Sequence, residues 1–128
     1  MITIQKTASE WLAEAEVELA QANEAWRGGN AGKGRVGSRR AAGMALKAWL
    51  EAGARPVGQG QVYGTSFMHH LRAVADDGEL PVAIREAGWR LAARPAPEGG
   101  FQVPLPQGLT PMQDAQAIMT WCQSLLAH

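Results

Sequence analysis

Residues 31–50 read AGKGRVGSRRAAGMALKAWL, and this stretch decides the fold. Among its glycines and alanines it carries four cationic side chains, Lys33, Arg35, Arg39 and Arg40. Small residues let a second backbone approach closely, whereas clustered arginines need an anionic partner. The stretch therefore forms the tightly packed centre of a helical bundle, the wall of an anion site, or both at once.

The apolar positions of this stretch recur with helical spacing, which predicts a helix over residues 31–52. Its apolar stripe consists of Val36, Gly43, Leu46, Trp49 and Leu50. A ridge of small residues at four-residue spacing is formed by Gly37, Ala41 and Ala45. Each glycine inside a helix costs up to about 1 kcal/mol relative to alanine. We expect close packing against another helix to compensate for this cost.

Four more helices are predicted around this one. Residues 8–27 have a strong helical seam, capped by Thr7 with Glu10 three residues later. A short helix follows a cap at Thr65 or Ser66 and ends at residue 75. Another runs over residues 81–93, and the last begins at Thr110 after a proline-rich loop over residues 95–109. The chain is thus predicted to be one domain (residues 1–128), an all-α, four- to five-helix up-and-down bundle.

Composition places the chain among globular proteins. Of its 128 residues, 46% are hydrophobic and 19% are charged, and the net charge is zero. The lone cysteine, Cys122, lies on an apolar helical stripe, so it predicts a buried thiol and a reducing compartment. The N-terminus has no apolar signal core, and no apolar run reaches the length of a membrane span. We therefore expect a cytoplasmic protein without membrane association.

The charges are divided into two blocks along the chain. Residues 7–26 contain five acids and no base, and residues 27–47 contain six bases and no acid. Two antiparallel helices could pair these blocks, although surface pairs contribute only about 0–1 kcal/mol each. Alternatively, part of the basic block stays available for an anion. On that interpretation, the predicted ligand contacts are Arg35, Arg39 and Arg40.

The sequence offers little catalytic or metal-binding chemistry. Gly32, Gly34 and Gly37 match a dinucleotide fingerprint only literally, because a helix and not a strand precedes them. His69 and His70 are adjacent, so they point apart on a helix and cannot easily share a metal. Either could be a ligand contact or a general acid or base; otherwise one lies on the surface and the other packs in the core. We predict no metal, no cofactor and no catalytic residue.

Three segments together resemble a known family. The first contains Trp11-Leu12, Ala15, Leu19 and Ala22, and the second is the stretch from Arg40 to Lys47 followed by Leu50. In the third, Gly64-Thr65-Ser66-Phe67 leads to Leu71. In this order they resemble the HEPN family of small prokaryotic helical bundles. The resemblance implies a HEPN-like fold and a homodimer.

The resemblance also bears on function. The family includes ribonuclease toxins, paired with nucleotidyltransferase antitoxins, and non-catalytic relatives that bind nucleotides or RNA. The ribonucleases carry an arginine followed within a few residues by a histidine. Here no histidine follows Arg85, Arg90 or Arg94 before the terminal His128, so no catalytic residue can be transferred.

We therefore expect a non-catalytic HEPN-like bundle in a toxin–antitoxin context. It would bind a partner protein, such as a nucleotidyltransferase, or the phosphate of a nucleotide or RNA. One alternative is a divergent ribonuclease that uses His69 or His70 with an arginine from another helix. Another is a structural interaction module whose partner surface includes Trp11 and Trp121, which lie off the strongest apolar seams.

Overall fold

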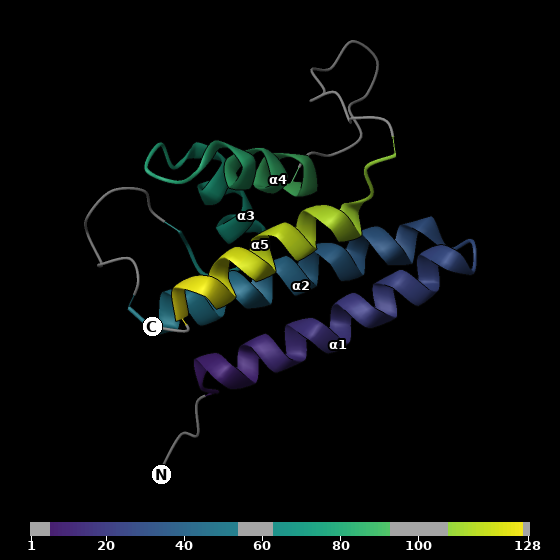
Figure 1. The fold of residues 1–128 in the computed structure, drawn as a ribbon, viewed down its shortest axis with the longest axis horizontal. Helices are drawn as coiled ribbons and strands as arrows, with labels where there is room; N and C mark the ends of the chain where they lie inside the picture. The colour runs from purple at the N-terminus through teal and green to yellow at the C-terminus, as the bar shows by residue number, and fades with distance from the viewer. Residues whose placement is uncertain (1–5, 54–62, 93–107, 127–128) are drawn as a thin grey trace.

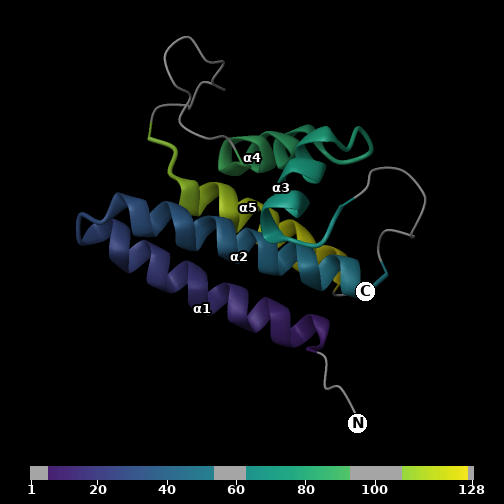
Figure 2. The ribbon, with the colours of Figure 1, turned by 180° about the vertical axis from the view of Figure 1, so that it is seen from behind.

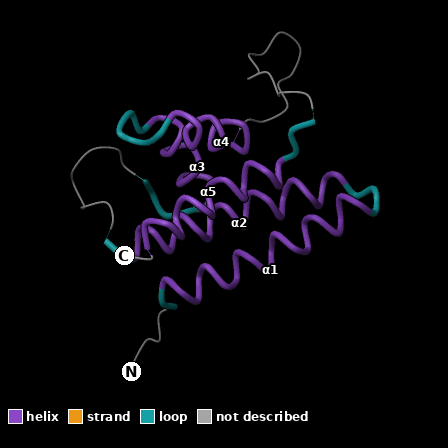
Figure 3. Tube along the Cα trace, in the orientation of Figure 1, coloured by secondary structure: helices purple, strands orange, loops and turns teal. Residues whose placement is uncertain are grey.

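The computed structural model describes residues 6–53, 63–92 and 108–126, and over these residues the chain is helical with no strand (Figures 1 and 3). The helices are α1 (Ala8–Arg27), α2 (Ala31–Glu51), α3 (Phe67–Asp76), α4 (Val82–Ala92) and α5 (Pro111–Leu126). Their bounds agree with the sequence prediction to within one or two residues. The predicted irregular loop over residues 95–109 lies almost wholly outside the described residues.

Side-chain caps fix where α1, α3 and α5 begin, and Asn30 caps α2 in the same way. Thr7 and Glu10 form the predicted reciprocal pair at α1, with both hydrogen bonds at 3.2 Å. At α3 the cap is Ser66, whose hydroxyl accepts from the backbone N–H of His69 at 3.1 Å. Thr110 and Gln113 form a second reciprocal pair at α5. These bonds satisfy backbone N–H groups that have no partner inside the helix.

Helix α2 lies at the centre and contacts each of the other four helices. In Figures 1 and 2, α1, α2 and α5 lie side by side, and the α3–α4 pair covers the opposite side of α2 from α1. No described helix combines the length and apolar character that crossing a lipid bilayer would require.

The glycines of α2 are positions of close helix packing. A Cβ atom built on Gly37 would lie 2.8 Å from the Cβ of Ala22 in α1, and one on Gly34 would lie 2.9 Å from the Trp26 ring. A Cβ on Gly43 would overlap Phe67 at the start of α3. Larger side chains at these positions would force the helices apart. The small-residue ridge is therefore the packed centre of the bundle, as the first of the two interpretations predicts.

One residue of the predicted stripe lies outside the core. The sequence places Val36 with the inward-facing positions of α2, but its side chain is 53% exposed. Val36 and Gly43 are seven residues apart, so they share a face of α2 about two turns apart. Helix α3 meets that face at Gly43, through Phe67, whereas Val36 is left exposed. The prediction for Val36 was wrong because helical spacing gives the face but not how far a neighbouring helix covers it.

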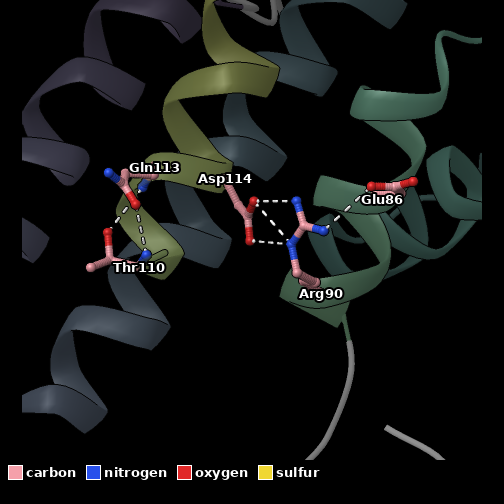
Figure 4. A network of polar contacts seen from close by, with 5 residues as sticks. All are labelled: Glu86, Arg90, Thr110, Gln113 and Asp114. Carbon is pink, nitrogen blue, oxygen red and sulfur yellow. Dashed lines mark hydrogen bonds and ion pairs between the residues drawn. The ribbon is translucent and has the colours of Figure 1, made fainter. Parts of the chain in front are cut away.

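A buried ion pair joins α4 to α5. The guanidinium of Arg90 donates three hydrogen bonds to the carboxylate of Asp114, at 2.9 to 3.2 Å. In Figure 4 these two side chains face each other across the interface, and Glu86 approaches the guanidinium from its own helix. Because Asp114 lies in the first turn of α5, the positive end of that helix also favours its charge.

Candidate functional site

The three arginines predicted as ligand contacts point to different parts of the molecule. Arg35 is exposed, and its guanidinium carbon lies 5.8 Å from the centre of the Trp26 ring of α1. Arg40 is also exposed, and its Nε lies 3.4 Å from the Glu18 carboxylate. Arg39 is half-buried, and its Nε donates to the backbone carbonyl of Leu91 at 2.7 Å. The structure therefore does not bring the three side chains together.

The contact of Arg39 has a structural function. Leu91 lies in the last turn of α4, where carbonyl groups have no partner inside the helix. A cation there satisfies a carbonyl and interacts favourably with the negative end of the helix. Arg85 makes a similar, longer bond of 3.4 Å to the carbonyl of Ala75 near the end of α3.

The two charge blocks are mostly not matched to each other. Among the described side chains, the bond between Arg40 and Glu18 is the one ion pair that joins α1 to α2. Lys47 pairs with Glu51 in its own helix, at 3.0 Å. Antiparallel packing therefore relieves little of the basic block by direct contact.

Part of the basic block gathers where α1 turns into α2. Arg27 lies in the last turn of α1, and Lys33 and Arg35 lie near the start of α2. All three are exposed, and none has a carboxylate within 4 Å in the described part of the chain. We call these three residues the cationic end. It lies at the α1–α2 turn, seen at the right of Figure 1.

The backbone adds positive potential at the cationic end. Helix α2 begins here, with Asn30 as its cap and no acidic residue in its first turn. The N-terminus of a helix carries partial positive charge that favours anions. Both the side chains and the helix therefore favour a negatively charged ligand at this end.

A groove runs between α1 and α2 beside the start of α3, with a volume of about 530 Å³. Trp11, Met44 and Phe67 supply its apolar lining, and the Trp11 and Phe67 rings meet edge to face at 6.2 Å. Its charged residues cancel in two pairs: Lys6 with Glu14, and Arg40 with Glu18. The groove therefore has no net charge from these four residues and favours neither an anion nor a cation.

The two tryptophans predicted for a partner surface pack on other aromatic rings. Trp11 is half-buried in the groove against Phe67, and the half-buried Trp121 ring lies 5.1 Å from that of Trp49. The more exposed tryptophan is Trp89, at 45%. Much of the surface of Trp11 and Trp121 is therefore covered by other aromatic rings of this chain.

The adjacent histidines are separated by burial. The side chain of His69 is exposed, whereas His70 is 1% exposed and its Nδ1 lies 2.9 Å from the backbone carbonyl of Tyr63. Burial lowers the pKa of His70, so the buried ring is neutral at pH 7. Within the described ranges, neither ring is hydrogen-bonded to an arginine or a carboxylate, and no group of three or more metal-ligating side chains occurs. The sequence left open that one histidine lies on the surface and the other packs in the core, and this is the arrangement found.

Sequence reasoning missed the polar cluster next to His70. The Tyr63 hydroxyl donates to the Asp77 carboxylate at 2.6 Å, and both residues are buried. The one sequence signal is that Tyr63 is the single tyrosine of the chain and precedes a glycine. Cys122 is buried as predicted, and burial raises the pKa of its thiol to about 12, which makes it unreactive.

Comparison with known proteins gives no relative for this chain: no family model, no curated protein and no solved structure matches it.

Proposed function

We propose that this protein is a non-catalytic helical bundle that binds the phosphate groups of a nucleotide or RNA through its cationic end. The observation that supports this proposal is the set of three exposed cations, Arg27, Lys33 and Arg35, without a described carboxylate partner. Charged side chains left unmatched beside a helix N-terminus are suited to an anionic ligand.

Arg35 is the principal contact in this proposal. A guanidinium can donate two parallel hydrogen bonds to one phosphate, and the Trp26 ring beneath it restricts its orientation. Lys33 and Arg40 are seven residues apart on one face of α2, separated by about 10 Å along the helix. Arg40 could therefore contact a further phosphate of a longer ligand once it releases its exposed ion pair with Glu18. Arg39 is a secondary candidate because it already holds the end of α4.

The HEPN-like interpretation belongs to the same proposal. Non-catalytic members of that family bind nucleotides or RNA, which is the ligand chemistry that the cationic end would accept. The homodimer and the nucleotidyltransferase partner implied by the resemblance stay predictions.

The geometry gives less support to the ribonuclease alternative. A general acid or base must reach the reacting group, but the His70 ring is enclosed by protein. The His69 ring is exposed but has no hydrogen-bonded partner among the described residues that would position it. We therefore favour binding over cleavage.

Titration of a fluorescein-labelled single-stranded RNA, followed by anisotropy at 50, 100 and 200 mM salt, tests the proposal. We expect the Lys33→Gln/Arg35→Gln variant to bind at least tenfold more weakly. The slope of log affinity against log salt should fall by about 1.4, or 0.7 for each lost phosphate contact. Competition with unlabelled ATP distinguishes a nucleotide site from an RNA site.

The matched control is Lys47→Gln/Arg72→Gln, which makes the same change in net charge at a half-buried and an exposed position away from the cationic end. It should bind RNA within twofold of the native chain. Equal loss in both double variants, or no binding of RNA or ATP by the native chain, would refute the proposal. Cleavage of the RNA during the titration would contradict its non-catalytic part.

A further inference from the structure

Four buried side chains form a continuous cluster that the phosphate proposal does not use. Tyr63 is held at its backbone by His70 in α3, and at its hydroxyl by Asp77, which caps the end of the same helix. Its ring packs edge to face on Trp49 of α2, with centroids 5.3 Å apart. We call Trp49, Tyr63, His70 and Asp77 the Tyr63 clasp. It attaches the chain before α3 to both ends of α3 and to the central helix.

The hydrogen bond to Tyr63 fixes the tautomer of His70. A backbone carbonyl can only accept, so Nδ1 must carry the hydrogen and Nε2 keeps its lone pair. Nε2 is fully buried and has no hydrogen-bond partner among the residues that the structure describes. If the ring were protonated, Nε2–H would be a buried donor without an acceptor, and such a group is costly.

The charges around His70 do not favour an imidazolium. Lys47 on α2 and His69 on α3 act on the ring, and each lowers its affinity for a proton. The nearest acid in the clasp, Asp77, already accepts the Tyr63 hydroxyl and the backbone N–H of Glu79. A protonated ring would therefore be more stable in water than in the closed clasp.

We propose that proton uptake by His70 opens the Tyr63 clasp, which makes the clasp an acid-sensitive conformational device built into the fold. Movement of the ring into water breaks its bond to the Tyr63 carbonyl and loosens Tyr63 from Asp77 and Trp49. Helices α1 and α2 contain no histidine, so their packing through Gly34 and Gly37 stays in place. The cationic end contributes nothing to the clasp, so this inference stands apart from the phosphate proposal.

The direction of the pH effect follows from burial. Because burial lowers the pKa of His70 from 6.5, the ring takes up its proton at lower pH in the closed clasp than in the open one. Well above pH 6.5 both forms are neutral and the clasp stays closed. As the pH falls below 6.5 toward the lowered pKa, the open form gains a proton first and becomes progressively favoured.

Amide hydrogen exchange, expressed as protection factors at pH 7.5 and 5.5, tests the device. On acidification we expect a several-fold loss of protection in residues 63–77, with an upper limit of about tenfold because one proton is taken up, while α1 and residues 41–46 of α2 change less than twofold. The His70→Asn variant keeps an amide N–H near the Nδ1 position but cannot titrate, so its protection should not depend on pH in this range. The His69→Asn control should respond like the native chain.

Each contrary result is decisive. The inference is wrong if the native segment keeps its protection, if His70→Asn responds as the native chain does, or if α1 loses protection in parallel. Should the variant fail to fold, NMR titration of the His70 ring in the native chain decides. A midpoint below 6.5 that coincides with the loss of protection supports the device, and any other midpoint overturns it.

Discussion

The ion pair between Arg90 and Asp114 shows what a single buried charge requires. The side chains are 12% and 4% exposed, and three hydrogen bonds join them. The hydrogen bonds to Asp114 contribute most to raising the pKa of Arg90, so the guanidinium is charged at every accessible pH. Each charge is acceptable in the interior only because the other is present.

Removal of one partner should therefore cost more than removal of both. We expect Asp114→Ala to lower the free energy of unfolding by about 3 kcal/mol, because the Arg90 charge is left without its main partner. The double variant Arg90→Met/Asp114→Leu should recover most of that loss. Glu86→Gln is the control, and because Glu86 is an exposed partner at 3.7 Å it should change stability by less than about 1 kcal/mol. Urea denaturation measures all three, and an additive double variant would contradict this account.

Residue-scale contacts were only partly predictable from the sequence. The caps at Thr7 and Thr110 were predictable, because the two residues that form each cap are three positions apart. The hydrogen bonds of Tyr63 to His70 and Asp77 were not predictable, because bonds between separate elements leave no local pattern in the sequence. The same reason explains why Arg39 was expected to bind a ligand and is instead found on the carbonyl of Leu91, 52 residues away.

At the scale of the helices, small residues decide how closely the elements pack. The Gly43→Ala substitution would place a methyl group against Phe67, and overpacking of this kind costs about 1–3 kcal/mol. Gly32→Ala is a matched control in the same helix, because the nearest atom to its new Cβ would be 3.9 Å away. We expect a lower melting temperature for Gly43→Ala and an equal or higher one for Gly32→Ala. Equal melting temperatures for both would show that α2 and α3 are not closely packed.

Helix positions were predictable because caps, glycines and apolar spacing are local signals. The sequence did not predict which parts of a helix surface stay uncovered by other helices. Val36 and the cationic end are two examples. Val36 was expected to be buried with the apolar stripe of α2, but its side chain is exposed. The sequence allowed part of the basic block to stay available for an anion but could not say which part. In the fold Arg40 and Lys47 have carboxylate neighbours.

At the scale of the whole molecule, the fold is organised around α2. It touches each of the other helices, while its first turns project beyond α3 and carry the cationic end. The centre of the bundle and the candidate ligand surface are therefore two parts of one helix. The small residues of the stretch 31–50 confirm its interpretation as the packed centre of the bundle. Its interpretation as the wall of an anion site stays a proposal.

The short connection between α1 and α2 has a consequence for the order of folding. Three residues, 28–30, join these helices, whereas α5 packs on α2 from about 60 residues further along the chain. Closing a short loop loses less entropy than closing a long one, so the hairpin should assemble first. Pulse-labelled refolding should protect the amides of α1 and α2 before those of α5, and simultaneous protection would contradict this order. On the ribosome, the first two helices could pair while the last is still being synthesised.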